Sequence, residues 1–259
     1  MSAEQSDELL LERRGPVLVA LLNRPAKRNA INRAISERLL EAVRQVDEDP
    51  GLNAGVLASS TPGMFCAGAD LAAMAAGDLL RPDGDPRPSF TRQPRRKPWI
   101  AAVAGPALGG GFEMALACEM IVAGENTTFG LPEARRGLLA AGGGVFRAVR
   151  ALPRAIGMEL VLTGRTMDAA EAGRLGLVNR VAPDAEVLEQ AVDLAQAVAA
   201  CAPLAVQESL ALARRATEAP ETDLWPEARA ALTRLMSGAD AKEGMRAFLE
   251  RRAPVWRGE

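Results

Sequence analysis

Two acidic residues and a cluster of glycines have the types and spacing that could do chemistry in this sequence. Gly109, Gly110 and Gly111 separate a strand-like apolar run from an apolar helical pattern, and Glu113 falls in the first turn of that helix. Backbone N–H groups at the positive start of a helix can hold an oxygen atom on which negative charge develops. Taken alone, the glycines also fit an ordinary tight turn, with Glu113 stabilising the helix dipole.

A second glycine turn and a second carboxylate have the same double interpretation. The turn at residues 65–70 (FCAGAD) follows a buried strand and leads into a short apolar helix. Glu133 follows a turn made rigid by Pro132, twenty residues after Glu113. Each feature alone also fits a plain strand-to-helix connection or a surface glutamate. Only their combination and order point to a catalytic site.

Residue types that are missing narrow the chemistry further. The 259 residues include no histidine and no tyrosine, which excludes the commonest general base, the Ser-His pair, the commonest metal ligand and phenolic acid catalysis. Cys66, Cys118 and Cys201 are far apart and lack metal-type spacing, so we interpret them as small reduced core residues. Carboxylates, lysines and backbone amides remain as catalytic groups, and we expect no metal site.

Composition gives no reason to expect a nucleic acid or a membrane as partner. The formal net charge is −2, so no strongly basic surface is available for phosphate. No apolar run approaches the roughly 20 residues that a membrane helix needs. Residues 1–8 lack the basic start and apolar stretch of a signal peptide, so we expect a cytoplasmic protein.

The elements that must position the candidate residues alternate in type over most of the chain. Short apolar runs predict strands, and apolar residues at helical spacing predict helices. Strands are expected at 15–22, 54–58, 99–104 and 120–123, and helices at 31–46, 112–120, 145–151 and 168–176. Residues 77–98, rich in proline, glycine, aspartate and arginine, predict a mobile surface loop. The fold class is therefore α/β.

Beyond residue 184 the pattern becomes almost entirely helical. Pro203 fits the first turn of a helix. Two acidic pairs, Asp168 with Glu171 and Asp240 with Glu243, have the spacing of a helix cap and its partner. We therefore predict a mixed α/β core to about residue 200, followed by a helical C-terminal part.

Several separate blocks of this sequence together resemble the enoyl-CoA hydratase/isomerase family, also called the crotonase superfamily. The resemblance runs from about residue 16 to the C-terminus. The blocks, in order, are LNRP at 22–25 with NA at 29–30, FCAGADL at 65–71, AGPALGGGFEMALAC at 104–118, FGLPEARRGL at 129–138, MELVLTGRTMDAAEAGRLGLVNRV at 158–181 and APLA at 202–205. Their order makes the family resemblance strong, whereas their content says less about the substrate.

The resemblance implies a fold and an assembly. The core, residues 1–200, is expected to be a crotonase-like spiral of ββα units that holds the CoA site and the active site. Residues 201–259 are expected to be a helical region used for trimerisation. The assembly implied is a homotrimer, or a hexamer built as a dimer of trimers.

The resemblance also implies roles for particular residues. The backbone amides of Ala69 and Gly110 would hold the thioester oxygen. Glu113 and Glu133 fall on the positions of the two catalytic glutamates of hydratases. Residues expected to contact the CoA part of the substrate are Arg28, Ala67, Asp70, Leu71, Gly109 and Pro132.

The activity that the resemblance implies is the reversible addition of water to the double bond of a 2-enoyl-CoA thioester, giving a 3-hydroxyacyl-CoA. Glu113 would activate the water and Glu133 would protonate Cα, with the roles exchanged in dehydration. The presence of both glutamates favours hydration over isomerisation of the double bond. No metal, flavin or nicotinamide is expected, since CoA arrives as part of the substrate.

Three competing functions remain open. The first is carnitinyl-CoA dehydration: residues 252–258 and the GRTM stretch at 164–167 look like carnitinyl-CoA dehydratase, a family member whose substrate carries a trimethylammonium group. A quaternary ammonium favours aromatic or acidic surroundings, and six Phe, three Trp and no Tyr supply few aromatic side chains. The second is enoyl-CoA isomerisation, and the third is acyl-CoA binding without catalysis. Acyl chain length is not readable.

Two departures from the family pattern concern the site. Where many hydratases read IPGAGG after the second glutamate, this chain reads LAAGGG at 139–144, next to the expected water position. Ala72 occupies a place where relatives often carry a lysine for a CoA phosphate. A nearby basic group either replaces that lysine or is a solvated charged surface; it consists of Arg92, Arg95, Arg96 and Lys97.

Overall fold

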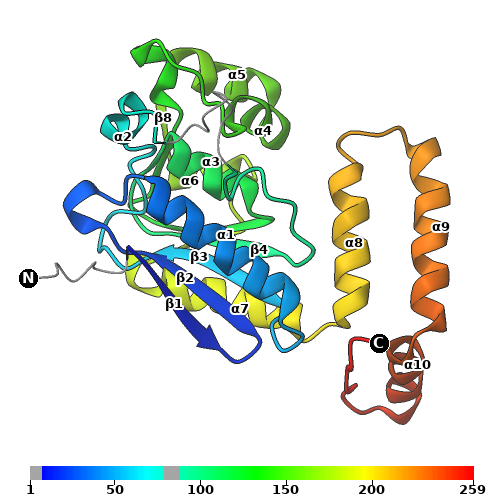
Figure 1. Ribbon diagram of the computed structural model, residues 1–259. Coiled ribbons are helices and arrows are strands. Elements are labelled where there is room, and N and C mark those ends of the chain that lie inside the picture. The colour runs from blue at the N-terminus through cyan, green and yellow to red at the C-terminus, as the bar shows by residue number, and fades with distance from the viewer. Residues whose placement is uncertain (1–7, 79–87) are drawn as a thin grey trace, which may run out of the picture.

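A six-stranded sheet lies at the centre of the fold (Figure 1). The computed structural model describes residues 8–78 and 88–259, so the first seven residues and the middle of the expected loop lie outside the described part. In sheet order the strands are β1 (Leu9–Arg14), β2 (Val17–Leu22), β3 (Ala54–Ser59), β4 (Trp99–Val103), β6 (Met120–Gly124) and β9 (Arg180–Ala182). β1 and β2 form an antiparallel hairpin, and the later neighbours pair in parallel. The four strands expected from the sequence correspond to β2, β3, β4 and β6.

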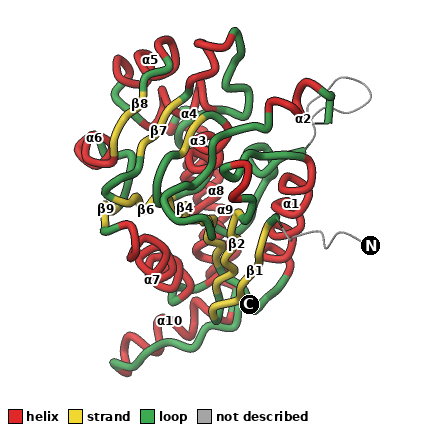
Figure 2. The backbone as a smooth tube through the Cα atoms, turned by 90° about the vertical axis from the view of Figure 1, so that its left-hand side faces the viewer, coloured by secondary structure: helices red, strands yellow, loops and turns green. Residues whose placement is uncertain are grey.

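Alternation along the strands gives this sheet two apolar faces. Val17 and Val19 of β2 pack on the same side as α7 (Val187–Ala199), whereas Leu18 packs on the opposite side with α1 (Arg33–Glu48). Figure 2 shows these two helices on opposite sides of the strands. Burial of one such side chain stabilises the fold by about 2 kcal/mol. The parallel strands are therefore held by helices on both faces, as parallel sheets generally are.

A small three-stranded sheet supports the glycine-rich turn. Its strands are β5 (Ala107–Leu108), β7 (Thr128–Gly130) and β8 (Thr166–Asp168). Helix α3 (Gly110–Ala117) starts where β5 ends. The amide of Gly109 donates to the carbonyl of Gly130 at 2.9 Å. This bond joins the start of α3 to the turn that precedes Glu133.

Shorter helices complete the core. They are α2 (Leu71–Ala75), α4 (Gly144–Ala151), α5 (Arg154–Thr163) and α6 (Ala169–Arg174), with the 3-10 helices η1 (Pro25–Lys27), η2 (Pro132–Arg136) and η3 (Asp184–Glu186). The side chain of Asp70 caps α2, and that of Asp168 accepts a hydrogen bond from the amide of Glu171 at the start of α6. The cap expected from Asp168 and Glu171 is confirmed.

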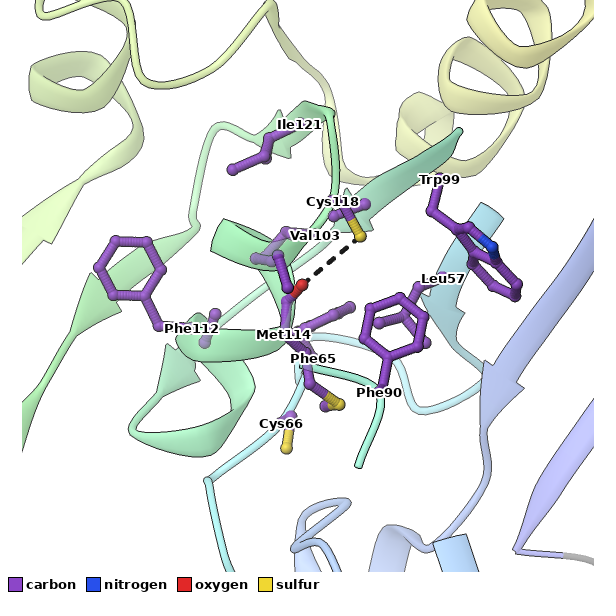
Figure 3. Close-up of a cluster of buried hydrophobic side chains, with 14 of the residues drawn as sticks. Leu57, Phe65, Cys66, Phe90, Trp99, Val103, Phe112, Met114, Cys118 and Ile121 are labelled. Carbon is purple, nitrogen blue, oxygen red and sulfur yellow. Dashed lines mark hydrogen bonds between the residues drawn. The ribbon is translucent and has the colours of Figure 1, made fainter. Parts of the chain in front are cut away.

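Residues 88–98, here called the strap, differ from the surface loop that the sequence predicts. Phe90 is only 2% exposed and packs edge-on against Trp99, with ring centroids 5.2 Å apart (Figure 3). Arg95 and Lys97 are buried as well, and the Arg95 guanidinium lies 4.4 Å from the Phe90 ring. The Lys97 ammonium donates to the carbonyls of Val46, Asp49 and Leu52. The prediction is wrong for the strap, because one aromatic anchor and two buried cations leave no periodicity to read.

The C-terminal helices form an arm beside the core (Figure 1). They are α8 (Pro203–Arg215), α9 (Glu221–Ser237) and α10 (Ala239–Glu250). Pro203 is the first residue of α8, as expected, and the helical character of this region is confirmed. Arg214 ties the arm to the core through hydrogen bonds to the carboxylate of Glu119 and the carbonyl of Arg95. The domain boundary near residue 200 stays a prediction.

The acidic residues expected to cap α10 hold the C-terminal tail instead. Asp240 accepts hydrogen bonds from the amides of Arg257 and Gly258, at 2.7 and 2.9 Å. Glu243 accepts hydrogen bonds from Arg252 and from the amide of residue 255, and these bonds lower the pKa of its carboxyl. The predicted cap is wrong because the returning tail offers both carboxylates donors that they bond in place of the first-turn amides.

The tail also contacts the junction between core and arm. The indole N–H of Trp256 donates to the carbonyl of Ala200 at 2.8 Å. The same ring lies against α10, where a side-chain carbon added at Gly244 would be 3.3 Å from it. Trp256 therefore connects α10 with the end of α7.

Among the described helices, none by itself has the length and apolar composition of a membrane span. The segments Asp184–Ala199 and Pro203–Arg215 reach that length and composition only as a pair, with a bend of 107° between them.

Candidate active site

Glu113 lies almost completely buried in the first turn of α3. Its side chain is held by backbone, because Oε1 accepts a hydrogen bond from the amide of Gly144 at 2.9 Å. Gly142 approaches just as closely: a side-chain carbon added there would lie 2.7 Å from Oε2 of Glu113. The glycines after residue 141 therefore form a cradle of main-chain atoms around this carboxyl. We call residues 142–144 the glycine cradle.

Burial and the cradle act on Glu113 in opposite directions. Desolvation raises the pKa of the carboxyl above its usual range, because a charge loses its water shell. Hydrogen bonds from the amides of Gly144 and Gly142 lower it, as do the charges of Arg147 and Arg92. The net direction is upward.

Glu133 has different surroundings. It follows Pro132 in the first turn of η2, and its Oε2 is buried without a hydrogen-bond partner among the described residues. Burial raises the pKa of this carboxyl, a hydrogen bond from the residue's own amide and the charge of Arg136 lower it, the charge of Glu113 raises it, and the net direction is upward. Oε1 lies against the backbone of Gly109, where an added side-chain carbon would be 2.8 Å away. An unpartnered oxygen of this kind favours the protonated form of Glu133.

Two backbone amides lie together beside the carboxyls. The amides on either side of Ala69 are used elsewhere: Gly68 contacts the sulfur of Cys66, and Asp70 donates to the carbonyl of Ile31. Among the described residues, the amide of Ala69 donates to no protein group, and that of Gly110, first in its helix, has no intrahelical acceptor.

Glycine is required for this close approach. Gly68 has φ +103°, and a side-chain carbon there would lie 2.9 Å from the carbonyl oxygen of Leu108 and 3.4 Å from the amide nitrogen of Gly110. A carbon added at Gly110 would in turn lie 3.4 Å from the amide nitrogen of Ala69. The two turns that the sequence singles out are therefore packed backbone to backbone, and Ala69 and Gly110 line the same cavity.

One cavity of about 540 Å³ contains these groups. Eight of the site residues expected from the sequence line it: Ala67, Ala69, Leu71, Gly109, Gly110, Glu113, Pro132 and Glu133. Two do not. Arg28 is exposed outside it, although its carbonyl accepts a hydrogen bond from the amide of Ala67 at 3.0 Å. The side chain of Asp70 caps α2 and forms an ion pair with Arg24 at 2.7 Å. It therefore stabilises the turn and does not line the cavity.

Sequence reasoning missed a large part of the cavity wall. One side of it comes from α1, including Ser36 and Leu40, and another from the strap, including Phe90 and Thr91. Helical periodicity could have identified the α1 residues as a partly exposed face beside the buried one. The strap gave no such signal.

The basic group at 92–97 does not form a single patch. Arg92 lines the cavity, whereas Arg96 contacts Asp47, and Arg95 and Lys97 are buried against backbone carbonyls. Ala72 lies exposed at the start of α2. Of the four cations, only Arg92 is therefore placed to meet a ligand in the cavity.

The LAAGGG departure has a clear structural outcome. Ala140 is buried, Ala141 lines the cavity, and the following glycines form the cradle. The altered residues therefore leave the amides that hold Glu113 in place.

This arrangement can carry out acid–base chemistry on a ligand with a carbonyl group. Two carboxyls of raised pKa can accept and deliver protons, and two converging amides can stabilise an oxyanion. Among the described residues, no group of three or more acidic or cysteine side chains is placed to hold a metal ion.

The sequence of this chain is similar to one family model and to individual proteins over almost its whole length. A model of the family described as enoyl-CoA hydratase/isomerase matches residues 12–259. A carnitinyl-CoA dehydratase of Salmonella typhi is 41% identical over 98% of this chain and 99% of its own length. The enoyl-CoA hydratase EchA19 of Mycobacterium tuberculosis is 40% identical over 98% of this chain and 97% of its own length.

Solved structures agree in fold. The crystal structure of an enoyl-CoA hydratase from M. tuberculosis H37Rv superposes with a TM-score of 0.92 at 42% identity, covering 98% of this chain and all of that one. The enoyl-CoA hydratase EchA1 of Mycobacterium marinum gives 0.93 at 40% identity, with the same coverage. The expected fold class, a core of this type with a helical C-terminal region, is confirmed.

Proposed function

Because this chain belongs to the enoyl-CoA hydratase/isomerase family, we propose that it is an enzyme that reversibly adds water to the double bond of a 2-enoyl-CoA thioester, giving a 3-hydroxyacyl-CoA. One observation carries the proposal: Glu113 and Glu133 line the same cavity, next to the unused amides of Ala69 and Gly110. Hydration of a conjugated thioester needs these groups together, and a binding protein does not.

The amides of Ala69 and Gly110 form the oxyanion hole of the proposed reaction. When water attacks Cβ, the electrons of the double bond move toward the thioester oxygen, which becomes an enolate oxygen. Donors fixed in advance at that position stabilise the charge, and loss of one costs about 3 kcal/mol of barrier. Both are main-chain groups held by turns, so they do not have to reorganise during the reaction.

The two carboxyls divide the proton transfers. The carboxylate of Glu113 accepts a proton from water as the water oxygen bonds to Cβ. The carboxylic acid of Glu133 delivers a proton to Cα. The pKa values of both carboxyls are raised, and what supports this division is the Oε2 atom of Glu133, which is buried without a partner among the described residues and so favours the acid. Glu113 has main-chain donors that stabilise its charged form. In dehydration the roles are exchanged.

CoA enters as part of the substrate, and no metal or redox cofactor takes part. Ala67, Leu71, Gly109 and Pro132 line the cavity that holds the proposed thioester site. Arg28 is exposed, and its carbonyl accepts a hydrogen bond from the amide of Ala67 in this turn, so Arg28 is proposed to meet the adenine nucleotide, with Asp70 in a supporting role. Activity that survives prolonged dialysis against a chelator is the expected result.

A panel of 2-enoyl-CoA substrates of increasing chain length tests the proposal, with loss of the conjugated absorbance as the signal. Turnover of at least one member is expected. Formation of a shifted double bond without hydration would identify an isomerase. Tight acyl-CoA binding without turnover of any member would identify a non-catalytic binder, and either result would remove the proposal.

Crotonobetainyl-CoA hydration is the second candidate. The 41% identity to a carnitinyl-CoA dehydratase favours it. The cavity wall does not: Phe90 is the one aromatic side chain among its described residues, and Glu37 is engaged with Arg33 at 2.7 Å. A trimethylammonium group would lack an aromatic cage there. Comparing the kcat/KM of crotonyl-CoA and crotonobetainyl-CoA separates the two.

We also propose a cytoplasmic homotrimer, or a hexamer made from two trimers. Large apolar side chains lie exposed on the arm, and so much exposed apolar surface is typical of an interface. They include Trp225, Leu232 and Met236 of α9 and Phe248 and Leu249 of α10. Light scattering coupled to size exclusion measures the mass directly, and a monomer at working concentration would contradict this part.

A further inference from the structure

A single arginine connects the two backbone segments that border Glu113. Arg147, on the first turns of α4, is half-buried. One guanidinium nitrogen, Nη1, donates to the carbonyl of Gly142 at 2.9 Å, and the other, Nη2, donates to the carbonyl of Thr91 at 2.6 Å. The side chain thus links the glycine cradle to the strap.

The packing around the guanidinium is close. A side-chain carbon at Gly143, whose φ is +109°, would lie 2.2 Å from Nη1 of Arg147. Gly142 and Gly144, on either side of it, are the residues whose amides contact the Glu113 carboxyl. One residue of the cradle is therefore bound on its carbonyl side by Arg147 and on its amide side by Glu113.

The charges around this group come from several elements. Arg147 from α4 and Arg92 from the strap act on Glu113, which in turn acts on Glu133 of η2. Arg147 itself is influenced by Arg95 of the strap and Arg150 of its own helix, and by the buried thiol of Cys118. Burial lowers the pKa of Arg147, and Glu113 opposes that shift.

We propose that Arg147 is a positioning residue for the proposed hydration: its planar fork fixes the glycine cradle against the strap and thereby fixes the carboxylate that activates water. A planar fork can donate to two carbonyls at once, which an ammonium cannot do with the same geometry. Arg147 does not line the cavity and transfers no proton. The expected effect on kcat rests on the proposed function. The expected effect on the pKa of Glu113 does not, because it is measured in the protein without substrate.

Three variants separate geometry from charge. Arg147→Met removes both, Arg147→Gln keeps donors without charge, and Arg147→Lys keeps charge without the fork. Arg147→Met is expected to lower kcat on the order of 10²-fold with a much smaller change in KM, because a displaced base costs rate rather than binding. Arg147→Lys is expected to lose a large part of kcat too.

The matched control is Arg150→Met. Arg150 lies one turn further along α4, is exposed, and stacks over the same Phe146 ring, at 5.7 Å compared with 5.5 Å for Arg147. It contacts neither the cradle nor the strap through a hydrogen bond among the described residues. Its kcat and KM are expected to equal those of the wild type.

A readout that needs no turnover tests the same claim. In protein labelled with ¹³C at the glutamate carboxyls, the Glu113 signal is identified by its loss in Glu113→Gln. The pKa of the Glu113 carboxyl should rise in Arg147→Met and Arg147→Gln, which lack the charge. It should stay unchanged in Arg150→Met and near the wild-type value in Arg147→Lys, which keeps the charge. Where the pKa of Glu113 rises, the acidic limb of the pH profile of kcat/KM should move to higher pH by the same amount.

The outcomes are distinct. Wild-type protein without hydratase activity would overturn the proposed function and leave the carboxyl titration to decide whether Arg147 acts on Glu113. Equal kcat and equal Glu113 pKa in Arg147→Met and Arg150→Met would overturn the positioning role. If Arg147→Met does not fold, wild-type kcat in Arg147→Lys would overturn it, since that variant lacks the fork.

Discussion

The surroundings of Glu113 and Glu133 differ, although both side chains line one cavity. Glu113 is bound by the glycine cradle, whereas Glu133 has a buried oxygen without a partner among the described residues. Main-chain donors stabilise a carboxylate, and an unpartnered buried oxygen favours the acid. In the proposed reaction, this difference would let two carboxyls of one cavity act as base and acid at the same pH.

The largest effects should come from removing each carboxyl. Glu113→Gln and Glu133→Gln should each lower kcat by about 10²–10⁴-fold, the usual contribution of a general base or acid. Steady-state hydration of crotonyl-CoA measures the loss, and circular dichroism checks that both variants are folded. Full activity in either variant would remove that residue from the mechanism and end the comparison.

Adding one carbon beside each carboxyl should give the next largest effect. In Gly142→Ala the added carbon would contact the carboxyl of Glu113, and in Gly109→Ala that of Glu133. Each variant should lower kcat by about 10- to 100-fold, because the reacting group is displaced. Gly137→Ala, with φ +68° and nothing within 4 Å of an added carbon, controls for a positive φ alone, since the ψ of −124° at Gly109 adds strain that Gly137, with ψ +23°, lacks. A Gly109→Ala variant no slower than Gly137→Ala would show that the contact with Glu133 is unimportant.

Stability against pH should distinguish the two carboxyls without any substrate. A carboxyl whose folded-state pKa is raised binds more protons in the folded than in the unfolded state, so stability falls as pH rises through the interval between the two values. Glu133→Gln has no carboxyl to titrate here, so it should not lose this stability as pH rises. Its melting temperature should exceed that of the wild type by a few degrees at neutral pH and approach it in acid.

Glu113→Gln should gain less than Glu133→Gln, because two cradle amides stabilise the carboxylate of Glu113, whereas one amide, its own, does so for Glu133. Differential scanning fluorimetry from about pH 5 to pH 8 covers the window in which raised carboxyl pKa values act. Equal gains in the two variants would mean that the cradle does not distinguish Glu113 from Glu133.

The smallest effect is expected far from both carboxyls. Arg28→Ala should raise the KM for the CoA thioester a few-fold and leave kcat unchanged, since Arg28 is exposed outside the cavity. Lys27→Ala, an exposed neighbour in η1, is the matched control. A kcat change in Arg28→Ala would show that this turn influences the chemistry and not only binding.

Local signals made much of the core predictable. Strands β2, β3, β4 and β6 are short apolar runs, and the cap at Asp168 follows from spacing alone. The two glycine turns could be singled out because only glycine permits backbone to approach backbone so closely. That they meet at one cavity is a property of the fold, which came from the family resemblance.

Contacts between distant segments could not be read in the same way. The strap owes its order to the packing of Phe90 on Trp99 and to the hydrogen bonds of Lys97 to carbonyls in the last turn of α1 and just after it. Asp240 has the spacing of a cap, yet bonds the returning tail. Arg147 is one of many arginines in the sequence, and only the positions of Gly142 and Thr91 in space reveal its two acceptors.

The bond from Trp256 to Ala200 has a mechanical consequence for the arm. Any swing of α8 and α9 about the segment after α7 must either break this indole bond or take the chain end with it. The last few residues thus restrain the angle between the arm and the core. Shortening them should loosen the angle between the arm and the core without touching the residues that line the cavity.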